Sequence, residues 1–101
     1  MLFLSMLTAQ NRAVLKGIAT NLKDLVFVGK EGVTDNVITQ VNDNLFAHEL
    51  IKIKVQRSVN DEIKQIANTL AEKCDAEVVS IIGSKILLYK YTSKPKFNHL
   101  I

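Results

Sequence analysis

The sequence has little of what stabilises secreted or membrane proteins: one cysteine, one proline and no tryptophan in 101 residues. Cys74 cannot form an internal disulfide, which fits a reducing compartment, and we expect it to be a small buried side chain near a helix end. The apolar start MLFLSML spans seven residues and lacks the basic flank and cleavage site of a signal peptide. We therefore expect a cytoplasmic protein without membrane contact. If Met6 is the natural start, residues 1–5 are an extension.

Residues that support catalysis or metal binding are also scarce. The chain has two histidines, His48 and His99. His48 stands beside Glu49, but one histidine and one carboxylate do not provide the ligands of a zinc site. We interpret His48 as a helix-end residue in favourable contact with the helix dipole, and His99 as incidental. The sequence thus predicts a protein that is not an enzyme and has no cofactor, metal or small-molecule substrate.

Aromatic residues make up only 6% of the chain. Phe27, Phe46, Tyr89 and Tyr91 are expected in or near the core. Base stacking requires exposed aromatic rings. The expected burial therefore favours recognition of nucleic-acid backbone and shape over stacked single-strand bases.

The composition is sufficient for one hydrophobic core. Apolar residues make up 48% and charged residues 23% of the chain, which is typical of a globular domain. A chain of this length can fold as one unit without disulfides. We predict a single domain over residues 1–91 and a loosely attached basic tail at 92–101.

The charges are distributed unevenly. All ten acidic residues lie between positions 24 and 77, so residues 1–23 and 78–101 carry only basic charge. Two basic ends that meet in space would form a patch suited to a polyanion. Ordinary solvated lysines explain the charges equally well. The basic residues of the two ends are Arg12, Lys16, Lys23, Lys85, Lys90, Lys94 and Lys96.

Apolar periodicity predicts three helices and four strands. Helices are expected from Thr8 to about residue 22, from Thr34 to about residue 45, and from about Asn60 to Cys74. Strands are expected at 25–28, 50–56, 78–82 and 85–91, the last two joined by a type II′ turn at Gly83-Ser84. The order α-β-α-β-α-β-β predicts an α/β fold, either an α+β two-layer arrangement or a sandwich, with a mixed four-stranded sheet covered by helices.

Two side-chain patterns accompany these elements. On the first helix, Arg12, Lys16 and Lys23 fall within about 40° of one another and form a basic ridge away from the apolar stripe. In the strand LIKIKVQ, alternation places Lys52 and Lys54 on the face opposite the core.

The stretch VGKEGVTD, residues 28–35, uses two of the four glycines in one short loop between a strand and a helix. Backbone N–H groups at a helix start and the positive end of the helix dipole can bind an anion, and Lys30 adds a cation. The alternative is a plain turn that needs glycine for its conformation. Glu31 opposes anion binding because its charge cancels that of Lys30.

Four blocks in order resemble the CRM domain, named for chloroplast RNA splicing and ribosome maturation, in its stand-alone bacterial YhbY form. They are LKGIA at 15–19, VGKEGVT at 28–34, HELIKIK at 48–54 and IGSKILLYK at 82–90. The resemblance implies a fold similar to the C-terminal domain of bacterial translation initiation factor three. It also implies an RNA-binding G-x-x-G loop and association with 23S ribosomal RNA or large-subunit precursors in ribosome assembly.

Carried over residue by residue, the resemblance implies an RNA site made of the loop and a basic surface. Two positions depart from the family pattern: the segment 19–23 lacks a common proline, and Ser84 replaces a usual basic residue. The alternative is a non-enzymatic protein-interaction module that binds an acidic partner. The implied RNA-binding residues are Gly29, Lys30, Glu31, Gly32, Arg12, Lys16, Lys23, Lys52, Lys54, Lys85 and Lys90.

Overall fold

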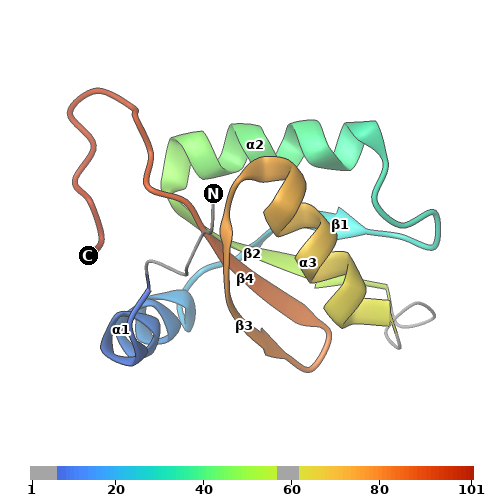
Figure 1. Cartoon of the computed structure of the whole chain (residues 1–101), viewed down its shortest axis with the longest axis horizontal. Coiled ribbons are helices and arrows are strands. Elements are labelled where there is room, and N and C mark those ends of the chain that lie inside the picture. The colour runs from blue at the N-terminus through green and yellow to red at the C-terminus, as the bar shows by residue number, and fades with distance from the viewer. Residues whose placement is uncertain (1–6, 57–61) are drawn as a thin grey trace.

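The computed structural model describes residues 7–56 and 62–101, and Figure 1 shows their arrangement. The predicted order of elements is confirmed. The expected helix start at Asn60, Met6 and the extension at 1–5 lie outside the described residues. The elements are α1 (Ala9–Ala19), β1 (Asp24–Val28), α2 (Asp35–His48), β2 (Leu50–Val55), α3 (Ile63–Cys74), β3 (Glu77–Ile82) and β4 (Lys85–Tyr89).

The four strands form one mixed sheet in the order β1-β2-β4-β3, as the predicted fold class requires. β1 and β2 are parallel because α2 carries the chain back between them, whereas β4 pairs antiparallel with both β2 and β3. The β3–β4 turn contains Gly83, whose φ of 59° suits the first central position of a type II′ turn.

Local signals position the first two helices. Thr8 accepts a hydrogen bond from the N–H of Asn11 at 3.0 Å, and the Asn11 side chain accepts one from the Thr8 N–H at 3.3 Å. Thr34 accepts a hydrogen bond from the N–H of Val37 at 3.2 Å. Both threonines therefore act as the predicted N-caps, and each satisfies a donor that the helix leaves unpaired.

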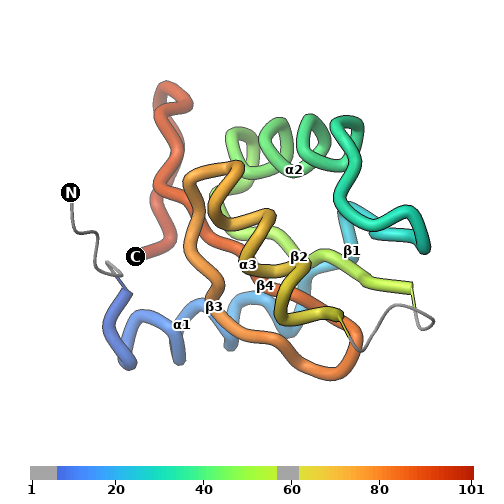
Figure 2. The backbone as a smooth tube through the Cα atoms, turned by 45° about the vertical axis from the view of Figure 1, so that its right-hand side comes forward, coloured from blue at the N-terminus to red at the C-terminus, as the bar shows by residue number. Residues whose placement is uncertain are grey.

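Helices α2 and α3 cover one face of the sheet (Figure 2). Their apolar stripes pack on alternate residues of the strands, including Val28, Ile51, Ile53 and Leu88, all of which are fully buried. This layer is the main core. No helix in the described part of the chain is long and apolar enough to cross a membrane.

Helix α1 covers only one end of the opposite face. Leu15 and Ala19 pack there with a second set of strand residues. Val14, expected on the apolar stripe, is 45% exposed instead. The other end of this face, toward the β3–β4 turn and the carboxyl ends of β1 and β2, lies outside the second cluster. The strand residues that α1 buries are Leu50, Val79, Leu87 and Tyr89.

The prediction that the chain from Thr92 onward is loosely attached was wrong. Thr92 is 3% exposed, and the carboxylate of the fully buried Glu49 holds this segment. Glu49 accepts hydrogen bonds from the N–H groups of Thr92 and Leu100, each at 3.0 Å. His99, expected to be incidental, lies 2.5 Å from the same carboxylate and stacks on Tyr91 with ring centroids 4.0 Å apart. The partner of Glu49 is therefore His99 and not its neighbour His48.

Candidate nucleic-acid interface

The loop at 29–32 is a tight turn between β1 and α2 that protrudes at one end of the molecule (Figure 1). The Gly32 N–H donates to the Gly29 carbonyl at 3.0 Å, which closes the turn. Gly32 has φ 74°, a conformation that side chains strain. Conformation alone therefore explains the second glycine.

Gly29 has no such explanation. Its φ lies outside the left-handed range. A Cβ placed there would lie 3.5 Å from Gln56 Oε1 and 3.6 Å from Phe27 Cε2, which are ordinary van der Waals distances. The fold would thus accept alanine at this position. A ligand that touches the backbone would not.

The loop adjoins the end of β2, which in turn adjoins the β3–β4 turn. The Gln56 N–H donates to the Val28 carbonyl at 2.8 Å, and the Val55 N–H donates to the Ser84 carbonyl at 2.8 Å. The end of β2 therefore lies between the glycine loop and the β3–β4 turn. Lys30 and Glu31 are both exposed, and Asp35 stands in the first turn of α2.

The strand lysines Lys52 and Lys54 lie on the face of the sheet away from the main core, as predicted, and α1 packs on one end of that same face. Register aligns Phe27 with Lys54, Lys54 with Lys85, and Lys85 with Ile82 in one row across the sheet. Lys54 is exposed and Lys52 half-buried. Lys85 forms an ion pair with Asp24 at 2.7 Å, so much of its charge is compensated.

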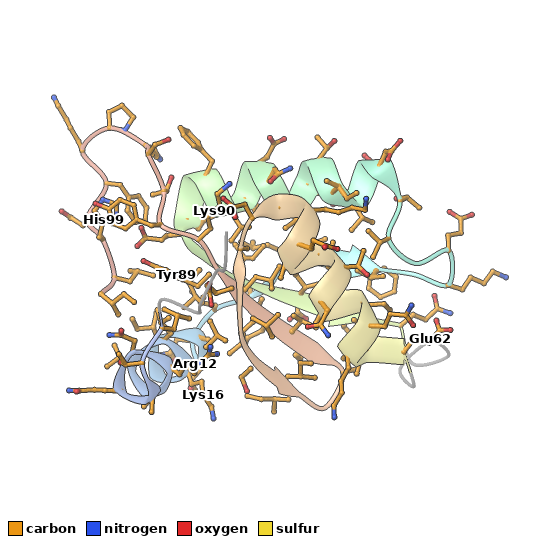
Figure 3. The ribbon with its side chains drawn as sticks, viewed as in Figure 1. Arg12, Lys16, Glu62, Tyr89, Lys90 and His99 are labelled. Atoms are coloured by element: carbon orange, nitrogen blue, oxygen red, sulfur yellow. The ribbon has the colours of Figure 1, made fainter. Side chains whose placement is uncertain are left out.

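The other predicted basic residues do not join this row. The prediction of a basic ridge on α1 was wrong, because the helix ends at Ala19 and Lys23 lies beyond it. Arg12 turns toward the sheet, where its Nη1 donates to the carbonyls of Val78 at 2.5 Å and Val79 at 3.2 Å. Figure 3 shows Arg12 and Lys16 on α1 at the opposite side from Glu62, and Lys90 in a third location.

Lys90 lies in an acidic environment. It lines a hollow of about 820 Å³ together with Glu72, Asp75 and Glu77. Three carboxylates make this hollow unsuitable for a polyanion. The glycine loop, Lys54 and Lys85 do not line it. The eleven predicted residues therefore divide among separate parts of the surface, and the loop with Lys52, Lys54 and Lys85 is the largest group.

The expected burial of the aromatic residues was largely wrong. Phe27 is 54%, Phe46 49% and Tyr91 64% exposed, and only Tyr89 is buried. The signal for Phe27 was present in the sequence, because it alternates with the buried Val26 and Val28.

Tyr89 and Cys74, whose pKa values are raised, both lie away from the loop. Burial raises the pKa of Tyr89 to about 12, with further contributions from Glu49 and Tyr91. Burial also raises the pKa of the Cys74 thiol, an effect that Lys90 partly opposes. In residues 7–56 and 62–101 there is no cluster of three metal-ligating side chains.

Known proteins resemble this chain over most of its length. A model of the CRS1/YhbY (CRM) domain family matches residues 7–90. The "Probable RNA-binding protein YqeI" of Bacillus subtilis (strain 168) is 35% identical over 91 residues, covering 90% of this chain and 95% of that protein. An "RNA-binding protein" of Haemophilus influenzae is 31% identical over 90 residues, covering 89% of this chain and 91% of that protein.

A solved structure has the same fold. The solution structure of protein SAV1595 from Staphylococcus aureus superposes with a TM-score of 0.78 at 36% sequence identity. The superposition covers 90% of this chain and 95% of that one.

Proposed function

This chain belongs to the CRS1/YhbY (CRM) domain family, and from that premise we propose that it binds RNA without turning over a substrate. The binding surface is the loop at 29–32 together with the adjoining open end of the sheet. RNA phosphates contact the loop backbone and Lys30, and Lys54 adds a second cation.

The proposal rests on Gly29. Neither its φ nor the space around it requires glycine, whereas Gly32 is explained by its own conformation. A missing Cβ allows a phosphate or ribose to approach the main chain, as in other nucleic-acid-binding glycine loops. The names of the relatives support the same ligand class.

We further propose that the RNA is ribosomal, in precursors of the large subunit, and that the protein acts in the cytoplasm as an assembly factor. Sedimentation of the tagged full chain from cell lysate through a sucrose gradient tests this. We expect it in fractions that contain large-subunit precursors, and nuclease treatment should move it to the top of the gradient.

Two other results would identify a different function. Protein found only at the top of the gradient, even at low salt, would refute the ribosomal role. A complex with another protein that survives nuclease would favour the interaction module with an acidic partner. Direct titration of a 23S ribosomal RNA fragment separates RNA binding itself from the ribosomal role.

A further inference from the structure

Phe27 is an exposed aromatic side chain at the next-to-last position of β1. It is 54% exposed, while Val26 and Val28 on either side are 3% and 0% exposed. It belongs to neither buried cluster, because α1 packs over the other end of this sheet face. A phenylalanine in this position leaves a large apolar ring in contact with water, where a ligand can cover it.

The ring of Phe27 lies directly beside the glycine loop. Its Cε2 atom is 3.6 Å from the place where a Cβ of residue 29 would stand. On the neighbouring strand, the sheet register places Lys54 as the next residue in the row. The aromatic ring therefore lies next to the backbone of Gly29 and has an exposed lysine as its neighbour on the adjacent strand.

The charges around the ring favour a nucleotide over an apolar partner. Lys30, in the loop that follows β1, and Lys54, the cross-strand neighbour of Phe27, are both exposed. The nearby acid Asp24 is paired with Lys85 at 2.7 Å and so contributes little negative charge. Glu31 is the one acid within the loop itself. Exposed aromatic rings and cations on one surface suit single strands, because bases stack on the rings while phosphates contact the cations.

We propose that Phe27 is a stacking platform for an unpaired base of the RNA whose backbone contacts the loop at 29–32. This inference rests on the proposed RNA binding and specifies its ligand as single-stranded or looped RNA. In a duplex the bases already stack on one another, and their faces are not available to the ring.

The test compares Phe27→Leu and Phe27→Tyr in the full-length protein. Leucine keeps an apolar side chain but removes the ring, whereas tyrosine keeps the ring. Phe46→Leu is the matched control, since Phe46 is 49% exposed on α2, across the sheet. The probes are a labelled twelve-nucleotide single strand of mixed sequence, its duplex and inorganic polyphosphate, titrated at low salt beside a thermal melt.

We expect Phe27→Leu to weaken single-strand binding by about 5- to 150-fold, the range for losing one stacked base. Phe27→Tyr and Phe46→Leu should bind like the unmodified protein. Polyphosphate and duplex affinity should not change in Phe27→Leu, because neither probe offers a free base face. The salt dependence should also stay the same, since no phosphate contact is lost.

Failure of the stacking proposal and failure of RNA binding give different results. Unchanged single-strand affinity in a folded Phe27→Leu protein, with Lys30→Asp weakening it, would refute stacking and leave RNA binding at the loop intact. An equal loss for polyphosphate and single strand would also refute stacking, because the effect would not depend on a base. No binding of any RNA by the unmodified protein would refute both proposals.

Discussion

Replacing Gly29 by alanine separates a turn residue from a ligand contact. In the folded protein the added Cβ would meet Gln56 Oε1 at 3.5 Å and Phe27 Cε2 at 3.6 Å, so it causes no clash. Alanine also restricts the unfolded chain, which raises the free energy of unfolding by about 0.4 to 1 kcal/mol at a compatible site. For a domain of this size we expect the melting temperature to rise by about 2 to 8 °C.

The same substitution should weaken RNA binding. A phosphate oxygen must come within about 2.9 Å of a backbone nitrogen to accept its hydrogen bond, and a methyl group at the point of approach prevents this. Loss of one hydrogen bond to a charged group costs about 1.5 to 3 kcal/mol. We therefore expect Kd for a ribosomal RNA fragment to rise by about 10- to 150-fold.

Gly32→Ala is the control for the turn. Gly32 has φ 74°, so alanine there should cost about 1 kcal/mol or more of stability and lower the melting temperature. Both variants are measured by fluorescence anisotropy at fixed salt and by a thermal melt on the same preparation. A Gly29→Ala protein that is more stable and binds RNA with unchanged affinity would refute the role of Gly29 as a ligand contact.

Three further predictions concern other charged and titratable groups. Lys30→Asp should weaken RNA binding by about 1 to 3 kcal/mol and reduce a log–log salt slope of roughly −3 to −5 by about 1, with a melting temperature within a few degrees. Lys94→Asp, an equal change of charge on the C-terminal segment, should have little effect in the same titration. Glu49→Gln should weaken three contacts to that segment, lower the free energy of unfolding by about 1 to 3 kcal/mol and speed tryptic cleavage after Lys96. Ultraviolet titration of Tyr91→Phe, which leaves Tyr89 as the sole tyrosine, should show ionisation clearly above pH 10, because burial and Glu49 still raise the pKa of Tyr89 when the contribution of Tyr91 is removed.

The sign of the tyrosine effect follows from linkage. The folded state raises the pKa of Tyr89, so the neutral phenol stabilises the fold fully below the unfolded value of 10.0. That contribution is lost as the pH rises through the folded value of about 12. Ionisation near pH 10 would contradict the burial of Tyr89. The prediction for Lys30→Asp would be contradicted if its salt slope equals that of the unmodified protein. The prediction for Glu49→Gln would be contradicted if tryptic cleavage of the C-terminal segment is no faster than in the unmodified protein.

The sequence was sufficient for the order of elements because the signals are local. Thr8 and Thr34 each cap a helix three residues from their hydrogen-bond partners, and alternation along 50–55 separates the two faces of β2. The glycine loop was also located correctly between β1 and α2. Its two glycines were indistinguishable in the sequence, since φ and neighbouring atoms are properties of the folded backbone.

Contacts between distant residues were not predictable in the same way. Glu49 and His99 are separated by 50 positions, and no periodicity links them. A buried carboxylate is unfavourable unless donors surround it, and here the donors come from the C-terminal segment itself. The C-terminal segment, which the sequence predicted to be loosely attached, therefore supplies the partners of the buried Glu49 carboxylate. For this reason we expect Glu49→Gln both to release the segment and to lower the stability of the whole fold.

Phe27 shows where strand alternation stops being informative. Alternation places Phe27 and Leu87 on the same face of the sheet, yet Leu87 is 2% and Phe27 54% exposed. The difference arises from the position of α1, which packs over Leu87 and ends before it could cover the row that contains Phe27. Helix length and docking position decide which half of that face is core and which half is open to a ligand. The open half, which combines an aromatic ring, lysines and the glycine loop, is the surface that we propose for RNA binding.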